Sequence, residues 1–462
     1  MREVLSLLEV AQRGVTGPKV ADKEWNMSLF RKLQELEKRY AFETFQNVQS
    51  SDGRAWRYQI LDGAEIEDYF QAGIDFLVEK GVYCVETHRV IQFSEQEIRD
   101  GIRMMPEQVT IGDGKDARQV RKHRWSGDRG YRLICGGLHH PVRVDLTPFI
   151  PLIFARISRV DFLEGFTFRE LEGYEIHGPA IEAYAAKREV AWMREGLRKA
   201  GRPGMSFVYY PISTRASTMI APLDPEFGIR RSDGALLAML PGIMCNYDYI
   251  TASIVYEQYG LAHKRQSGGG GGQFAAGSTA QLIAQVASTI AGWMVYRDNL
   301  GGGHAQIFDK KTNLMRVGGY ANLSGCLGLH GMLRMANTCI RHIAEGASAV
   351  VAGGAGRVES LTPTEVELVC EVVDATSKAG LKVEDAARIV EEIEGKQGVR
   401  DFFERINSYT EGRAITGWDG KDYGFGTLRT NYDLAKMQPS EQHYADYVKA
   451  KKIFSDYGLD MP

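Results

Sequence analysis

Two carboxylates and a run of aromatic residues have the clearest potential for chemistry in this sequence. Glu257 stands near the end of the apolar run ITASIVYEQ, and Glu164 stands near the end of SRVDFLEG. A carboxylate at the end of a buried strand is costly to hold unless it is paired or faces a cavity. The run SFVYYP adds aromatic side chains, namely Phe207, Tyr209 and Tyr210. Aromatic faces beside a carboxylate form a pocket suited to a cation.

Each of these features also has a plain structural interpretation. Glu257 could be an ion-paired surface carboxylate, and the aromatic run could be an ordinary layer of a barrel core. Residues two apart in a strand share a face, so Phe207 and Tyr209 lie on one side and Val208 and Tyr210 on the other. The pocket hypothesis turns Tyr209 inward and has it line one cavity with Glu257. Gln258 and Glu164 complete the predicted substrate contacts.

A metal site is an alternative. Cys135, His139 and His140 follow a predicted strand in CGGLHHP, and zinc there would need a further ligand such as Glu164. Cys84 and His88 are four residues apart, and we interpret them as structural packing. Our main interpretation contains no metal.

Strands alternate with helices from about residue 131 onward, which predicts parallel βα units. The predicted strands are 131–137, 158–165, 205–211, 250–258, 304–309 and 347–354. This number of units favours a (β/α)8 TIM barrel over an open sheet, with the chemistry at the carboxyl ends of its strands. We divide the chain into a mostly helical N-terminal extension (1–130), the barrel (131–430) and a C-terminal helical tail (431–462). The glycine run at 266–272 is expected to be a mobile loop without a phosphate.

Composition excludes several classes of protein. The 462 residues carry a net charge of −3 without a basic block, which disfavours a nucleic-acid partner. No apolar run is long enough to span a membrane, and the N-terminus does not resemble a signal peptide. Six scattered cysteines are typical of free thiols in a reducing cytoplasm. We expect a cytoplasmic homo-oligomer.

Four segments of the chain resemble the monomethylamine methyltransferases, corrinoid-dependent barrel enzymes of methanogenic archaea. They are QAGIDFLVEKGVYCVETHRVIQFSEQEI (71–98), DGKDARQVRKHR (113–124), AGRPGM (200–205) and YDLAKMQPSEQHYADYVKAKKIFSDYGL (432–459). The likeness spans nearly the whole chain and is weakest between about 220 and 345.

The resemblance places a reactive pyrrolysine a few residues after the Gly-Arg-Pro-Gly-Met turn. Counting back from Pro211, the matching residue is Tyr209; counting forward from Met205, it is Val208. Pyrrolysine is absent at both. Of the other pocket residues that the resemblance implies, Glu257 matches, whereas a second glutamate falls near Leu236 and is lost.

The resemblance therefore implies a methyltransferase whose methyl donor is a small methylated amine other than monomethylamine. Glu257 would steady the substrate cation, and Tyr209 would contact it or donate a proton. The chain lacks the Asp-x-His-x-x-Gly motif of corrinoid ligands, so the corrinoid (cobalamin) is expected on a partner protein. The alternatives are a zinc-assisted demethylase or hydrolase, and a non-catalytic barrel that binds a corrinoid protein.

Overall fold

The computed structural model describes residues 5–42, 63–137, 144–265, 278–301, 312, 315–321, 328–354, 361–403 and 428–462. The chain divides into two compact units. The first contains residues 1–109, 214–220 and 234–316, and the second contains 110–213, 221–233 and 317–462. The predicted strand at 304–309 and the glycine run at 266–272 lie outside the described residues.

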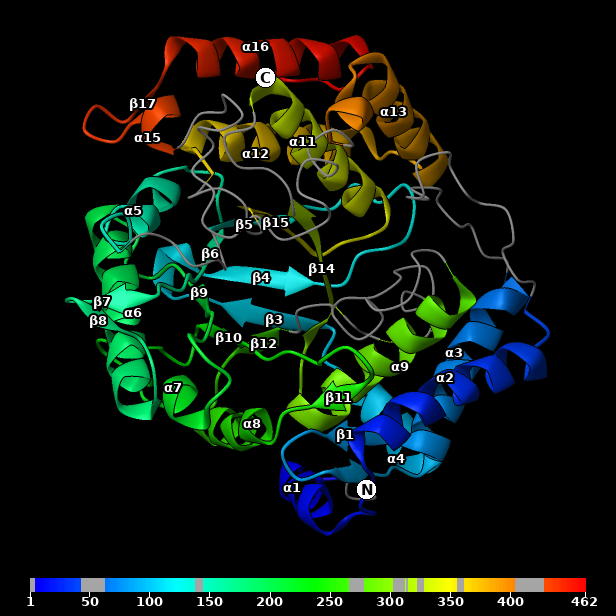
Figure 1. The fold of residues 1–462 in the computed structure, drawn as a ribbon. Coiled ribbons are helices and arrows are strands. Elements are labelled where there is room, and N and C mark those ends of the chain that lie inside the picture. Colours follow the sequence, from blue (N-terminus) through cyan, green and yellow to red (C-terminus); the bar gives the residue numbers. More distant parts are fainter. Residues whose placement is uncertain are drawn as a thin grey trace. The chain divides into compact units, whose positions relative to one another are not determined.

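The first unit combines a helical N-terminal part with a short parallel sheet (Figure 1). Its helices are α1 (Leu7–Thr16), α2 (Asp22–Arg39), α3 (Gly63–Lys80), α4 (Glu95–Arg103), α7 (Ala216–Ile220), α8 (Tyr247–Tyr259) and α9 (Thr279–Tyr296). Its strands are β1 (Val82–Cys84), β2 (Arg89–Ile91), β10 (Gly234–Leu236), β11 (Met244–Cys245), β12 (His263–Arg265) and β13 (Leu300–Gly301), with the start of β14 (Met315–Ala321). Strands β10, β12, β13 and β14 pair in this order and are all parallel.

The second unit contains the longer parallel sheet. Its strands pair in the order β14, β15 (Ala349–Gly354), β5 (Leu133–Gly137), β6 (Phe162–Glu164) and β9 (Phe207–Tyr209). Its helices are α5 (Ile150–Ala155), α6 (Pro179–Lys199), α11 (Gly328–Ala344), α12 (Pro363–Ala379), α13 (Val383–Lys396), α15 (Leu428–Asn431) and α16 (Glu441–Asp456). A 3-10 turn covers Gly114–Asp116, and the remaining short strands are β4 (Arg118–Arg121), β7 (Glu170–Leu171), β8 (Tyr174–Glu175), β16 (Tyr432–Asp433) and β17 (Gln438–Pro439). Strand β3 (Gln108–Ile111), where the two units meet in sequence, pairs with β4.

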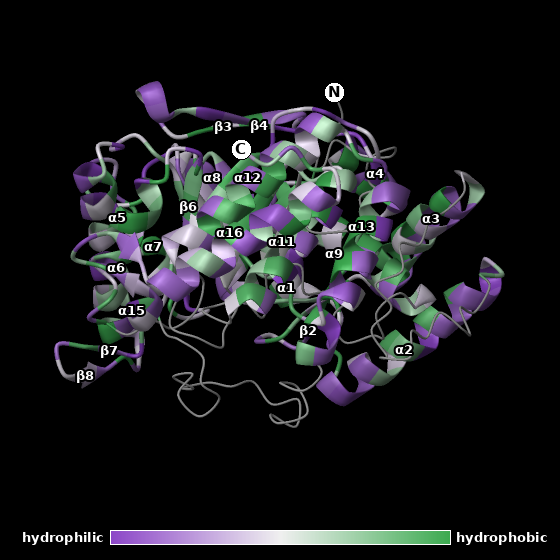
Figure 2. Cartoon of the chain, turned by 90° about the horizontal axis from the view of Figure 1, so that it is seen from above, coloured by the Kyte–Doolittle hydropathy of each residue, from purple (hydrophilic) through white to green (hydrophobic). Residues whose placement is uncertain are grey.

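Local sequence features explain where several helices begin and how they pack. A capping box begins α4, where the Ser94 hydroxyl accepts the Glu97 N–H and the Glu97 carboxylate accepts the Ser94 N–H. Helix α9 is buried along most of its length, and Gly73 of α3 allows the close approach, since a Cβ there would lie 2.3 Å from Val286. Helix α2 instead carries hydrophilic residues between its hydrophobic ones (Figure 2).

One predicted strand is wrong. Residues 250–258 belong to helix α8, which begins after Asn246 and ends at Gly260 in a left-handed conformation. The Asn246 side chain accepts the Tyr249 N–H, which is a typical N-cap contact. A short apolar run does not distinguish a strand from a buried helix by its periodicity, and the flanking cap residues decide here.

The motif GVYCVETHR at 81–89, which carries much of the family resemblance, ties the N-terminal helices to the β1–β2 hairpin. The Thr87 hydroxyl donates to the Gly14 carbonyl over 2.6 Å, and the Arg89 guanidinium donates to the Gly17 carbonyl over 2.8 Å. His88 Nδ1 lies 2.8 Å from the Tyr83 hydroxyl and 3.0 Å from Asp22. The described contacts of this motif are therefore structural.

Two buried aspartates position the amino ends of strands in the second unit. Asp161, just ahead of β6, accepts the Ile134 N–H of β5 over 2.9 Å. Asp233 accepts the Phe207 N–H of β9 over 3.3 Å. Each carboxylate satisfies a backbone donor that would otherwise be buried without an acceptor.

Candidate active site

Glu164 occupies the carboxyl end of β6, where parallel sheets commonly carry their functional residues. Its side chain is 1% exposed. Its register partners are Gly137 at the end of β5 and Val208 in β9. The predicted strand end is confirmed, and β6 is the fourth of the five parallel strands that pair in its unit, between β5 and β9.

The two faces of this sheet can be told apart by what a side chain would touch. A Cβ built on Gly136 would meet Leu163 and Phe154, and Phe154 belongs to α5. Gly136 and Leu163 therefore point to the face covered by helices, which we call the helix face. Helices α5 and α6 lie alongside β5, β6 and β9 in Figure 1. Glu164, one residue after Leu163, points to the opposite face, which we call the inner face.

The register of β9 assigns its aromatic residues to these faces. Phe207 pairs with Leu163 and lies on the helix face, where the Arg194 guanidinium of α6 stacks on its ring at 4.6 Å. Tyr209 shares the face of Phe207 and is fully buried. Val208 pairs with Glu164 on the inner face, and the same alternation assigns the partly exposed Tyr210 to that face.

The pocket hypothesis turned Tyr209 inward, and the structure corrects this orientation. Phe207 and Tyr209 face the helices, whereas Val208 and Tyr210 lie on the face of Glu164. Sequence alone left open which of Val208 and Tyr209 occupies the pyrrolysine position. Of the two, Val208 lies on the inner face. The catalytic role assigned to Tyr209 stays a prediction.

Glu257 and Gln258 lie near the C-terminal end of α8, and both are exposed. The Glu257 carboxylate acts electrostatically on Lys264 and Arg297. Burial lowers the pKa of Lys264 to about 8, and the Glu257 carboxylate opposes this shift. It opposes the lowering of the Arg297 pKa by burial in the same way. Glu257 therefore has cations of this chain as neighbours, and its proposed role toward a substrate cation stays a prediction.

A further carboxyl group, Glu189 of α6, lies directly behind the end of β6. It is fully buried, and its Oε1 accepts the Phe166 N–H over 3.2 Å. Gly165 leaves room for it, because a Cβ there would lie 2.8 Å from Glu189 Oε1 and 2.9 Å from the Tyr210 nitrogen. Among the described residues Oε2 has no hydrogen-bond partner. Glu189 therefore supports the turn that follows Glu164 from the helix face.

Burial raises the pKa of Glu189 well above its ordinary value, so folding favours the protonated carboxyl group. Sequence reasoning missed this residue. The signal was available, because Glu189 falls on the buried stripe of α6 at helical spacing from Ala185, Ala186 and Met193.

Replacing Glu189 with Gln should raise the melting temperature, and the gain should grow as the pH rises. The unfolded carboxyl ionises above a pH of about 4.3, whereas burial shifts ionisation of the folded carboxyl to higher pH, so wild-type stability falls as the pH rises from about 4.3 toward the raised pKa. Glutamine keeps an oxygen for the Phe166 N–H and cannot ionise. Melting curves of both proteins from pH 4.5 to pH 8 would measure the difference.

Glu195→Gln is the matched control on the same helix. A hydrogen bond from Arg198 lowers the pKa of the exposed Glu195 to about 2, so its small contribution is present at neutral pH and is lost toward acid. The control should show the opposite sign of pH dependence. A melting-temperature difference for Glu189→Gln that is flat from pH 4.5 to pH 8 would contradict a raised pKa of Glu189.

Only some of the residues in the zinc hypothesis lie within the described part of the chain. Cys135 is buried in β5 as the register partner of Phe162, on the inner face. His139 lies outside the described residues. Within the part of the chain that the structure describes, no three His, Cys, Asp or Glu side chains are grouped to hold a metal ion.

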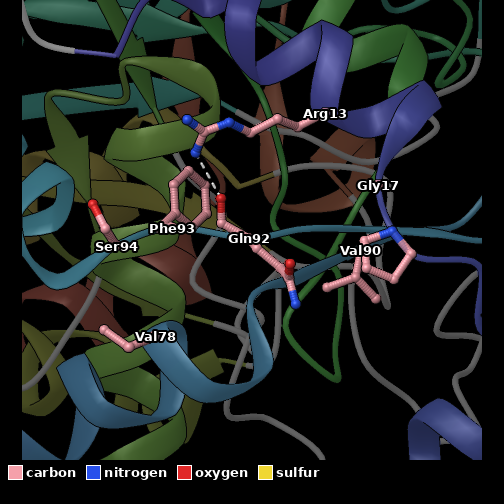
Figure 3. Close-up of a pocket in the computed structure, with 8 residues that line it drawn as sticks. Arg13, Gly17, Val78, Val90, Gln92, Phe93 and Ser94 are labelled. Carbon is pink, nitrogen blue, oxygen red and sulfur yellow. Dashed lines mark hydrogen bonds between the residues drawn. The ribbon is translucent and has the colours of Figure 1, made fainter.

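An open groove of about 470 Å³ lies in the first unit (Figure 3). Its lining residues all precede these strand ends in the sequence. It is lined by Arg13, Gly17, Pro18, Val78, Val90, Gln92, Phe93 and Ser94. The Arg13 guanidinium donates to the Gln92 carbonyl over 2.7 Å and forms an ion pair with Glu97 over 2.6 Å. Its charge is thus used within the protein, and we assign the groove no catalytic role.

Comparison with known proteins gives a full-length match. The family model described as monomethylamine methyltransferase MtmB matches residues 5–301. A monomethylamine methyltransferase from Methanosarcina mazei is 24% identical over 99% of both chains, and MtmB2 of Methanosarcina acetivorans is 25% identical over 97% of this chain and 96% of its own. The crystal structure of MtmB from Methanosarcina barkeri aligns with a TM-score of 0.81 and 21% identity over 99% of both chains. The described residues include no helix that is long and apolar enough to cross a membrane.

Proposed function

Because the chain belongs to the monomethylamine methyltransferase family, we propose that it moves a methyl group from a small methylated amine to a corrinoid held by a partner protein. We also propose that its parallel strands close into a (β/α)8 barrel, with the helical extension at 1–130 and the tail at 431–462. The full-length likeness to MtmB supports both proposals.

The inner face of the second unit would supply the substrate contacts. Glu164 contributes a carboxylate at the end of β6, and Tyr210 contributes an aromatic ring from the segment after β9. A buried carboxylate stabilises a cation more strongly than an exposed one, because less water screens the pair. An aromatic ring adds cation–π attraction for a methylated ammonium group. The proposed site rests on one observation, namely that the Glu164 carboxylate lies at the end of β6.

The substrate would differ from monomethylamine. Neither Val208 nor Tyr209 can hold a primary amine covalently, as the reactive pyrrolysine of the family is expected to do. A quaternary ammonium group leaves as a neutral amine without needing a proton, whereas the nitrogen of an unprotonated amine needs a donor. A pocket with a carboxylate and a ring therefore suits a quaternary or protonated methylated amine.

A panel of methyl donors tests this proposal. The protein would be incubated without oxygen with cobalamin reduced to cobalt(I) and, in turn, monomethylamine, dimethylamine, trimethylamine, tetramethylammonium or glycine betaine. Formation of methyl-cobalt(III) is followed by its absorbance. We expect transfer from a more highly methylated amine and little from monomethylamine.

The same panel distinguishes the alternatives. Preferred use of monomethylamine would contradict the proposed substrate class but keep the methyltransferase. Absence of transfer from every donor, also with a corrinoid protein as acceptor, would favour the non-catalytic binding protein. Stoichiometric zinc in protein purified without a His tag, lost on changing His139, would favour the zinc-assisted enzyme.

A further inference from the structure

Two cysteines that are distant in sequence are neighbours in the first unit. Cys84 ends β1 and Cys245 ends β11, and the two residues are register partners in adjacent parallel strands (Figure 1). Partners in neighbouring strands lie about 4.8 Å apart and point to the same face. Disulfides form across Cα separations of roughly 4.4–6.8 Å. Both side chains are fully buried, so a small reagent reaches them when the structure opens locally.

The surroundings of the two thiols differ. The Cys245 thiol donates a hydrogen bond to Cys84, and the backbone N–H of Thr87 donates to Cys84 as well, which lowers the Cys84 pKa to about 7 against the effect of burial. Burial raises the pKa of Cys245 well above its ordinary value. Burial also raises the pKa values of Cys339 and Cys370, which stay protonated. The thiolate is the form of cysteine that reacts with oxidants.

We propose that Cys84 and Cys245 are a redox-active dithiol, which a small peroxide converts to a disulfide. The Cys84 sulfur attacks one oxygen of hydrogen peroxide, which breaks the O–O bond and leaves a sulfenic acid and water. The Cys245 sulfur then attacks the Cys84 sulfur and expels the sulfenic oxygen as a second water, which carries the thiol proton of Cys245. Two thiols are oxidised by two electrons, and one peroxide is reduced to two waters.

The disulfide would join β1 to β11 and close a long loop of the chain. Such a crosslink restricts the unfolded chain more than the folded one, so the oxidised protein should unfold at a higher temperature. The two strands are already paired in register, so little rearrangement is needed to form the bond.

Mass spectrometry tests the pair directly. All proteins would carry Cys326→Ser, because Cys326 lies outside the described residues. The reduced protein is treated with a small excess of hydrogen peroxide, its remaining thiols are alkylated, and the digest is mapped. We expect a Cys84–Cys245 crosslinked peptide, two fewer free thiols per chain and a higher melting temperature.

Single variants separate the two roles. In Cys245→Ser, Cys84 should stop at the sulfenic acid and be trapped by dimedone, a reagent for that group. In Cys84→Ser, Cys245 should stay reduced, and Cys370→Ser should behave like the parent. Circular dichroism of each variant establishes that it is folded. Oxidation of Cys339 or Cys370 as fast as Cys84, or a persistent sulfenic acid with Cys245 present, would overturn the proposal.

Discussion

Glu164→Gln should lower the rate of methyl transfer by about 100-fold while the protein stays folded. Glutamine keeps the shape of the side chain at the end of β6 but removes the charge that the proposed site offers to a substrate cation. Loss of one buried charge pair worth about 3 kcal/mol corresponds to roughly 100-fold in rate. The measurement is the rate of methyl-cobalt(III) formation with the best donor from the panel, at saturating and at low donor concentration.

Glu257→Gln in the same assay tests whether Glu257 or Glu164 is the carboxylate that stabilises the substrate cation. The sequence-based hypothesis expects Glu257→Gln to abolish transfer, whereas the inner-face site expects the larger loss from Glu164→Gln. Glu195→Gln, an exposed change on α6, provides the reference for a carboxylate outside either site. If Glu257→Gln loses activity and Glu164→Gln retains it, the inner-face assignment is wrong.

The second large effect concerns stability. Asp233→Ala should destabilise the protein by about 3–5 kcal/mol, because it leaves Arg194 buried without its ion-pair partner. Asp233 also accepts the Phe207 N–H and the Arg230 N–H, so the change leaves backbone donors of β9 and its neighbouring loop without an acceptor. The fall in melting temperature, followed by circular dichroism, measures the effect.

The buried ion pair between Asp233 and Arg194 contributes little to the net free energy of folding. Burial raises the pKa of Asp233 to about 6 and lowers the pKa of Arg194, so for both groups the loss of water outweighs the mutual attraction. Removing both charges, as in Asp233→Ala with Arg194→Met, should therefore cost less than Asp233→Ala alone. A double variant that is less stable than the single one would contradict this account.

The sequence predicted the elements with strong local signals. The strands β5, β6 and β9 lie within the predicted runs. It did not predict β12 or β13, which are three and two residues long. Strand β12 contains His263, Lys264 and Arg265, so it has no apolar run that would distinguish it from a loop.

The sequence by itself determined the family and the absence of pyrrolysine, because both depend only on which residues stand in a motif. The tertiary structure decided which face of β9 the helices cover. A strand repeats every two residues whichever face the helices cover, so only the contacts of Gly136 and Phe207 with α5 and α6 placed Val208 beside Glu164. It also brought Cys84 next to Cys245, since strand pairing joins residues regardless of their separation along the chain.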